Sequence, residues 1–99
     1  MLVTVEILPW LSEHLSAGPA GRLTLTRDVG EGTTVRQVLE AIGADNQAFR
    51  ELVFRDDGEQ LPGYIMLLLN GRLIELAGGM EAEVRPGDTL RLIPGFSGG

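Results

Sequence analysis

Few residues in this chain of 99 could do chemistry together. The only histidine, His14, follows Glu13, and residues 56–59 read Asp-Asp-Gly-Glu. A nucleophile–histidine relay or a histidine metal cluster would depend on one imidazole. The acidic run lacks the alternating ligand spacing of a calcium loop. We therefore interpret both groups as solvated side chains, and we predict no catalytic residue and no metal site.

The composition excludes several further classes of function. Cysteine is absent, so the chain has no disulfide, no thiolate nucleophile and no cysteine metal site. Eight arginines and no lysine stand against 14 acidic residues, and the net charge of −6 disfavours nucleic acid or an anionic membrane as partner. A basic protein surface fits this charge better. No apolar run is long enough to span a bilayer and no signal peptide is evident, so we expect a cytoplasmic protein.

The C-terminal segment carries the remaining chemical signal. Residues 95–99 read Gly-Phe-Ser-Gly-Gly, which is too rich in glycine for a strand or helix. A frayed end without a role is the simplest interpretation of such a segment. The segment nevertheless follows a predicted core strand directly, and it ends in the two smallest side chains available. It is therefore also a candidate for a free carboxylate on a narrow, flexible peptide.

The first half of the chain predicts two strands and a helix. Residues 2–8 and 22–27 alternate between apolar and polar side chains, as half-buried strands do. The period then changes to that of an amphipathic helix, with apolar residues at Val35, Val38, Leu39 and Ile42. Thr34 and Gln37 fit a capping box at its start, and Gly43 fits a left-handed residue at its end.

A second, shorter helix is predicted after Asp45, which we take as its N-cap. Phe49, Leu52 and Val53 would form its apolar side. Residues 55–63 then form a polar loop.

The second half of the chain predicts strands. Residues 64–69 form an apolar run typical of a central strand that is covered on both faces, or nearly so. Asn70-Gly71 predicts a tight hairpin turn, with residues 72–76 as the returning strand. The last strand covers residues 90–93 and is stopped by Pro94.

This order predicts an α+β fold: a mixed sheet of about five strands with one main helix packed across it. We expect one domain over residues 1–94, followed by a flexible tail over residues 95–99. The length leaves no room for a second core.

Four segments together resemble a known family: Leu69-Asn70-Gly71-Arg72, Pro86-Gly87-Asp88, Leu92-Ile93-Pro94 and the terminal Gly98-Gly99. In this order they are similar to the ubiquitin-like β-grasp sulfur carriers, such as the small subunit of molybdopterin synthase and the sulfur carrier of thiamine biosynthesis. The resemblance spans essentially the whole chain. It departs at residues 95–96, Gly-Phe, where the family often has a proline or alanine and a small aliphatic residue.

The resemblance implies a carrier and not an enzyme. An E1-like enzyme, using ATP and magnesium, would adenylate the carboxylate of Gly99, and sulfur from a persulfide donor would displace AMP to give a thiocarboxylate. A synthase would then accept the sulfur. Gly95, Phe96, Ser97 and Gly98 would thread the partner's active site, and this chain would bind no cofactor itself.

Several alternatives remain open from the sequence. Molybdopterin synthesis is our first choice of pathway, with the large subunit of molybdopterin synthase as the accepting partner. A cysteine synthase type of partner comes second, and thiamine synthesis is a further alternative. The chain could instead be a ubiquitin-like modifier joined through Gly99 to another protein's lysine, or a plain interaction domain. For docking to a partner we single out Trp10, Leu68 and Phe96 as apolar candidates, with ordinary core packing as the simpler explanation for the first two.

Overall fold

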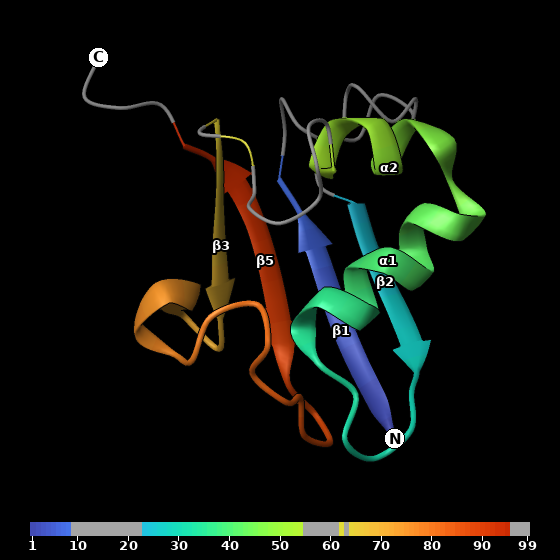
Figure 1. Ribbon diagram of the computed structural model, residues 1–99, viewed down its shortest axis with the longest axis vertical. Helices are drawn as coiled ribbons and strands as arrows, with labels where there is room; N and C mark the ends of the chain where they lie inside the picture. Colours follow the sequence, from blue (N-terminus) through green and yellow to red (C-terminus); the bar gives the residue numbers. More distant parts are fainter. Residues whose placement is uncertain (9–22, 55–61, 63, 96–99) are drawn as a thin grey trace.

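A computed structural model describes residues 1–8, 23–54, 62 and 64–95 of the chain. Its centre is a mixed five-stranded sheet with the order β2-β1-β5-β3-β4 (Figure 1). The strands are β1 (Leu2–Ile7), β2 (Leu23–Asp28), β3 (Ile65–Leu69), β4 (Arg72–Leu73) and β5 (Thr89–Pro94). β1 and β5 are parallel, and the other neighbours are antiparallel. The predicted α+β fold of the β-grasp type is confirmed.

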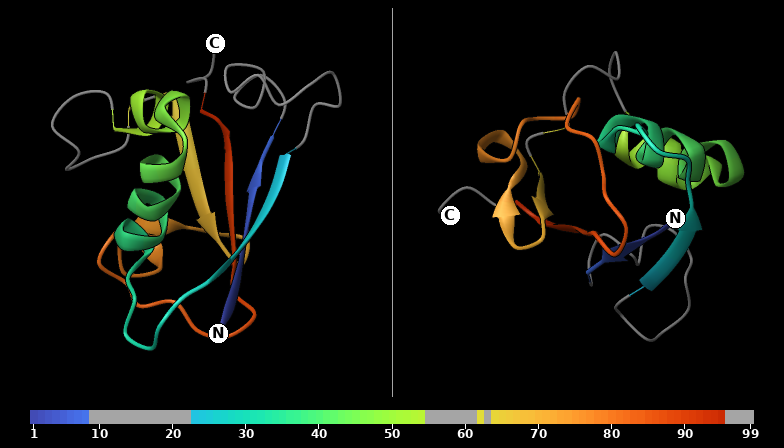
Figure 2. Two further views of the ribbon diagram at one scale, coloured as in Figure 1. Left: turned by 90° about the vertical axis from the view of Figure 1, so that its right-hand side faces the viewer. Right: turned by 90° about the horizontal axis from the view of Figure 1, so that it is seen from below.

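Two helices, α1 (Val35–Asp45) and α2 (Gln47–Val53), cover the same face of this sheet (Figures 1 and 2). The apolar stripe of α1 and the inward side chains of the strands close the core between the two layers. The least exposed large side chains there are Phe49, Ile7, Leu39, Ile42, Leu67, Leu90 and Leu92. Burying these side chains supplies most of the driving force for folding.

The start of α1 is as predicted, but its end is not. The Thr34 hydroxyl accepts a hydrogen bond from the Gln37 N–H, and the Gln37 side chain accepts one from the Thr34 N–H. Gly43, however, does not end the helix, which continues to Asp45. A Cβ at Gly43 would lie 3.2 Å from Cβ of Arg50, so the missing side chain lets α2 pack closely against α1.

The N-cap of α2 is Asn46, one residue after the Asp45 that the sequence indicated. Its side-chain oxygen accepts a hydrogen bond from the Phe49 N–H at 3.0 Å. Asn46 has an extended backbone conformation, which breaks the helical path and lets two helices follow each other with one residue between them.

The Asn70-Gly71 turn is confirmed, since both residues have positive φ angles, 51° and 87°. The predicted strand over residues 72–76 is wrong beyond Leu73. Ile74 turns into the core, where it is 3% exposed, and Ile74–Leu76 forms a single 3₁₀ turn. The pairing of β4 with β3 therefore ends at Leu73, because the side chain of Ile74 is buried in the core.

The prediction that residues 64–69 are buried on both faces is also wrong. Ile65 and Leu67 point into the core, but Met66 is 37% exposed on the opposite face. Consecutive side chains of a strand point to opposite faces, so an uninterrupted apolar run does not prove two-sided burial.

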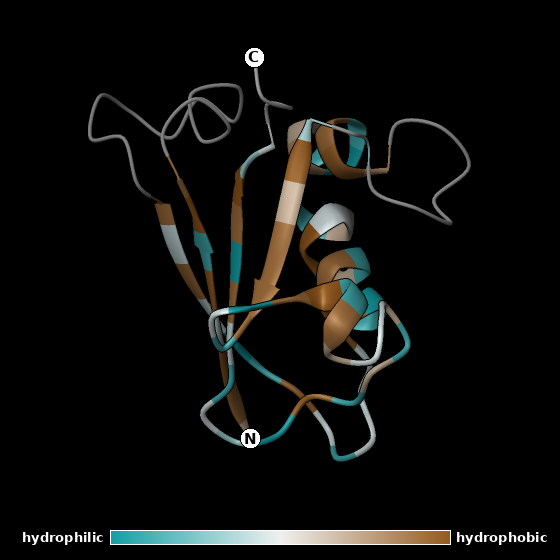
Figure 3. Ribbon diagram, turned by 90° about the vertical axis from the view of Figure 1, so that its left-hand side faces the viewer, coloured by the Kyte–Doolittle hydropathy of each residue, from teal (hydrophilic) through white to brown (hydrophobic). Residues whose placement is uncertain are grey.

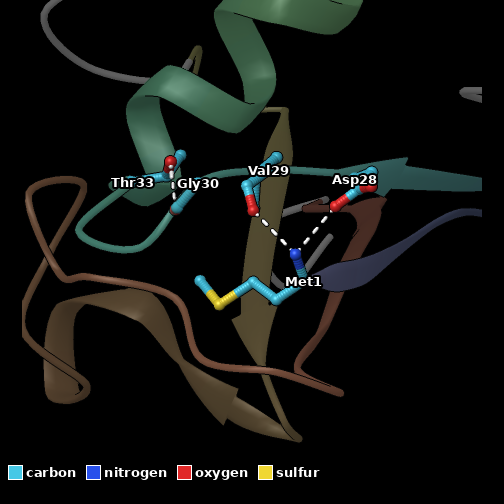
Figure 4. Close-up of polar contacts among 5 residues, drawn as sticks. All are labelled: Met1, Asp28, Val29, Gly30 and Thr33. Carbon is cyan, nitrogen blue, oxygen red and sulfur yellow. Dashed lines mark hydrogen bonds and ion pairs between the residues drawn. The ribbon is translucent and has the colours of Figure 1, made fainter.

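Met1 connects the start of β1 to the end of β2 (Figure 4). The amino group of Met1 donates to Asp28 Oδ1 at 2.7 Å and to the carbonyl oxygen of Val29 at 2.9 Å. In the loop that follows, the Thr33 hydroxyl donates to the Gly30 carbonyl at 2.6 Å. These contacts hold β1 and β2 together where the chain leaves the sheet for α1.

Candidate functional site

The C-terminal end of β5 is the first part of the candidate site. The sequence predicts a flexible tail from Gly95 onward, but the structure places Gly95 against β3: its N–H donates to the carbonyl oxygen of Tyr64 at 2.7 Å. The other tail residues, Phe96 to Gly99, lie outside the described residues, as does Trp10. Of the predicted site residues, the structure thus describes Gly95 and Leu68.

Pro94 is part of β5. Proline has no N–H, but at this position the missing N–H affects the pairing with only one of the two neighbouring strands, β1. Along β5 alternate residues bond to alternate neighbours. The Gly95 N–H bonds to β3, so the nitrogen of Pro94 faces the β1 side, where the last bond runs from Leu8 N–H to the Leu92 carbonyl. Proline thereby ends the pairing with β1 and leaves the ladder with β3 intact.

An apolar surface lies beside this strand end, on the sheet face opposite the helices. We call it the outer patch and define it by Met66, Leu68, Leu73 and Ile93. Met66 is paired with Ile93 and Leu68 with Leu73, so the four side chains are neighbours across β4, β3 and β5. No described element covers this face, and Figure 3 shows the helices on the other side. Leu68, predicted as a docking residue, is therefore at the surface and partly exposed.

An ion pair borders the outer patch. Arg91, which pairs with Leu68 across the ladder, donates from Nε to Glu6 Oε1 at 2.8 Å. The side chain of Glu6 is 19% exposed and that of Arg91 is 43% exposed. The surface thus changes from apolar at β3 to charged and polar at β1 within two strands, which is the composition expected of a reversible protein interface.

Two of the motifs that carried the family resemblance have a structural role at the opposite end of β5. Asn70 donates from Nδ2 to Asp88 Oδ1 at 2.9 Å and accepts the Thr89 N–H on Oδ1 at 2.9 Å. Asp88 Oδ2 accepts the Arg85 N–H at 2.8 Å. We call this set the Asn70–Asp88 clasp. Sequence reasoning identified both turns but not their contact, because residues 18 apart in sequence give no local signal.

The described residues contain no group of three or more histidine, cysteine, aspartate or glutamate side chains that could hold a metal ion. Within the same part of the chain, no helix has the length and apolar content needed to cross a membrane. The pairs Glu13–His14 and Asp56–Asp57, interpreted above as solvated groups, lie outside it.

Comparison with known proteins agrees with this geometry. The model of the ThiS family matches residues 19–99. A protein of Archaeoglobus fulgidus named "Putative sulfur carrier protein" is 35% identical over 69 residues, which are 70% of this chain and 77% of the relative. Small archaeal modifier protein 1 of Haloferax volcanii is 39% identical over 80 residues, with 81% and 86% of the two chains covered.

Solved structures share the complete fold. The crystal structure of SAMP1 from Haloferax volcanii matches with a TM-score of 0.78 at 29% identity, over the full length of both chains. CysO in a BexX/CysO complex from Amycolatopsis orientalis matches with a TM-score of 0.71 at 27% identity, over 98% and 99% of the chains. Urm1 from Trypanosoma brucei, at 23% identity and a TM-score of 0.74, supports the fold alone.

A five-stranded β-grasp sheet with its helices on one face and an open apolar patch on the other places this chain in the class of small ubiquitin-like proteins. Within that class, the chain belongs to the ThiS family of ubiquitin-like sulfur carriers. Its relatives are small carrier and modifier proteins.

Proposed function

We propose that this chain carries sulfur on the carboxylate of Gly99. An E1-like enzyme, with ATP and magnesium, adenylates this carboxylate with release of pyrophosphate. The outer sulfur of a persulfide donor then displaces AMP to give an acyl disulfide, and a second thiol cleaves this disulfide, which releases the thiocarboxylate and leaves the thiol in a disulfide with the donor. The observation that supports the proposal is the end of β5. The strand leads from the core to Gly95, beside the outer patch, and the sequence continues as Phe96-Ser97-Gly98-Gly99.

The residues of this chain would present the carboxylate and dock the carrier, without catalysing a step. A free α-carboxylate is ionised near neutral pH and is therefore ready to attack the α-phosphate of ATP. Gly98 and Gly99 have no Cβ, so this part of the chain fits a narrow channel. Leu68 and the rest of the outer patch would contact the enzyme, and Phe96 and Trp10 stay predicted contacts.

The accepting pathway is a prediction from the sequence. Molybdopterin synthesis comes first and the cysteine type second, because the long loop over residues 55–63 and the Gly78-Gly79-Met80 segment resemble carriers of these two types more than those of the compact thiamine type. The large subunit of a molybdopterin synthase would then be the second partner. The alternatives are the cysteine pathway, with a cysteine synthase type of partner, and the thiamine pathway. We place the protein in the cytoplasm, where ATP and a persulfide donor are at hand.

A second candidate function is protein modification. The relative from Haloferax volcanii that is 39% identical to this chain is named a modifier protein. In this alternative the same activated Gly99 would form an isopeptide bond with a lysine of another protein. The chain itself contains no lysine, so its own side chains offer no acceptor amine.

Intact-protein mass spectrometry separates the two candidates. The chain is incubated with the cognate E1-like enzyme, ATP, magnesium and a persulfide donor, and a parallel sample lacks the donor. A sulfur carrier shows a terminal thiocarboxylate that depends on the donor. A modifier instead gives lysine-linked conjugates that survive reductant and hydroxylamine. If Gly99 is unchanged in both samples, neither function holds and an interaction domain remains.

A further inference from the structure

Arg91 lies beside a hollow on the outer face of the sheet. The hollow has a volume of about 340 Å³, and it is lined by Glu6, Leu68, Asn70, Gly71, Thr89 and Arg91. The side chains of Leu90 and Leu92 are fully buried in the core, so the side chain of Arg91 between them points to the opposite face. The hollow therefore adjoins the outer patch, with which it shares Leu68.

Glu6 orients Arg91 but uses only part of its hydrogen-bonding capacity. A guanidinium carries five N–H donors, one of them on Nε and the others on the two Nη atoms. The Nε group donates to Glu6 Oε1 at 2.8 Å, and no other hydrogen bond or ion pair joins the side chain of Arg91 to a residue that the structure describes. The side chain is 43% exposed. Arg91 thus combines a defined orientation with Nη donors that are open to a partner.

The other polar side chains leave Arg91 as the main free group of the hollow. The Asn70 side chain is committed to the clasp, through Asp88 Oδ1 and the Thr89 N–H. The Glu6 carboxylate is 19% exposed and already accepts from Arg91. The hydroxyl of Thr89 bonds to no other group within the described part of the chain, so it adds a further donor beside the guanidinium.

A guanidinium in this setting fits a carboxylate. Its planar fork matches the two oxygens of a carboxylate, and such a bidentate pair has a defined geometry as well as a favourable charge. The net charge of −6 disfavours a nucleic acid or an anionic membrane, and a second copy of the chain would carry the same charge. An aspartate or glutamate side chain of a partner protein would fit both the donors and the apolar wall that Leu68 forms.

We infer that Arg91 binds a carboxylate side chain of the E1-like partner through its Nη atoms, and that this contact fixes the register in which the outer patch docks. The inference rests on the proposed function and deepens it. The apolar contacts of the outer patch are non-directional, so they alone would permit several orientations. A bidentate ion pair at the border of the patch selects one of them.

Binding measurements in a Glu6→Gln background isolate the guanidinium. Removal of Arg91 alone would leave the Glu6 carboxylate without its cation, and the cost of that unpaired charge would add to the result. In Glu6→Gln the side-chain oxygen can still accept from Nε, and no carboxylate is left behind. Isothermal titration calorimetry then compares Glu6→Gln with Glu6→Gln/Arg91→Gln for binding to the cognate E1-like enzyme, and the melting temperature of each variant is recorded.

The double variant should bind about tenfold more weakly than Glu6→Gln, because it lacks a charged, hydrogen-bonded contact with the partner. Glu6→Gln/Arg50→Gln is the matched control, since Arg50 is exposed and lies in α2, on the helical side of the sheet. Both double variants keep the net charge at −6, because the loss of Glu6 (+1) offsets the loss of one arginine (−1). The control should bind within about twofold of Glu6→Gln.

The outcomes separate this inference from the proposed function. Glu6→Gln should itself bind about two- to threefold more tightly than the unaltered chain, because Glu6 no longer shares the guanidinium charge with the partner's carboxylate. Weaker binding by Glu6→Gln would mean that the hollow takes a cation, which overturns the inference. Equal affinities of the two double variants overturn it as well. An unaltered chain that does not bind the enzyme contradicts the proposed function, on which the inference rests.

Arg91→Lys tests the bidentate geometry in a variant that keeps a cation beside Glu6. An ammonium is a point charge without the planar fork, so binding to the E1-like enzyme should weaken about threefold or more. Arg50→Lys is the corresponding control and should bind as the unaltered chain does. An Arg91→Lys variant that melts like the unaltered chain and binds with the same Kd would rule out the bidentate contact.

Discussion

At its first residue β5 is joined to the neighbouring turns by the Asn70–Asp88 clasp. Beyond its last residue, within the part of the chain that the structure describes, one hydrogen bond from Gly95 to Tyr64 continues the ladder. The clasp uses side chains and lies where the Asn70-Gly71 turn meets the Arg85–Asp88 turn. The other end uses backbone atoms alone, and proline has removed the bond toward β1.

The two ends of β5 differ in their expected roles. The clasp end contributes to the stability of the fold, and the Gly95 end would present the C-terminal segment to a partner. The clasp fixes the register of β3 and β5, and a register shift by one residue would turn the outer patch into the core. Under the proposed function, the Gly95 end would carry the segment that a partner receives. The motif residues Asn70 and Asp88 therefore contribute to the scaffold, whereas the residues after Gly95 would serve the transfer under the proposed function.

Breaking the clasp should produce the largest change in stability. Asp88→Ala removes the acceptor for the Asn70 side chain and for the Arg85 N–H, and it should lower the free energy of unfolding by about 1–2 kcal/mol. Chemical denaturation measures the loss. Exchange activity at a temperature where the variant is folded should be unchanged, and lost activity in a fully folded variant would contradict the division between the two ends.

The outer patch, which extends between the two ends of β5, should be sensitive to polarity in partner binding and not in stability. Leu68→Gln places an amide in the outer patch and should raise the KM of the carrier for the E1-like enzyme about tenfold, equivalent to about 1.4 kcal/mol. Leu2→Gln is the control, because Leu2 is 58% exposed and lies at the other end of the sheet. Equal KM values for the two variants would exclude the outer patch as the docking surface.

A smaller effect is expected from charge. The net charge of −6 should attract a basic partner, so the association rate should fall several-fold between low and high ionic strength as salt screens the charges. Stopped-flow association with the E1-like enzyme measures it. A rate that is flat across this range would rule out long-range attraction.

Local sequence signals predicted the capping box of α1 and the Asn70-Gly71 turn, missed the cap of α2 by one residue, and failed where distant backbones meet. The Thr34–Gln37 capping box and the Asn70-Gly71 turn depend on neighbours within four residues, and both are confirmed. Gly43 and Gly95 instead lie where α2 and β3, respectively, approach closely. Such contacts exist only after folding, so the sequence read alone suggested a helix end for the first and a flexible tail for the second.

The candidate site was predictable in part. Leu68 was singled out from the sequence and lies at the surface, whereas Gly98 and Gly99 lie outside the described residues and stay a prediction. The outer patch as a unit could not, since Met66, Leu73 and Ile93 come together only through the register of β4, β3 and β5.

Deletion of Gly98 and Gly99 tests the central proposal most directly. Gly98 and Gly99 lie beyond the Gly95 bond, so the free energy of unfolding should stay within about 0.5 kcal/mol of the intact chain. ATP–pyrophosphate exchange with the cognate E1-like enzyme should nevertheless be lost, because the carboxylate would end two residues, roughly 7 Å of extended chain, short of its place. Equal exchange by intact and shortened chains that melt alike would contradict both the carrier and the modifier functions.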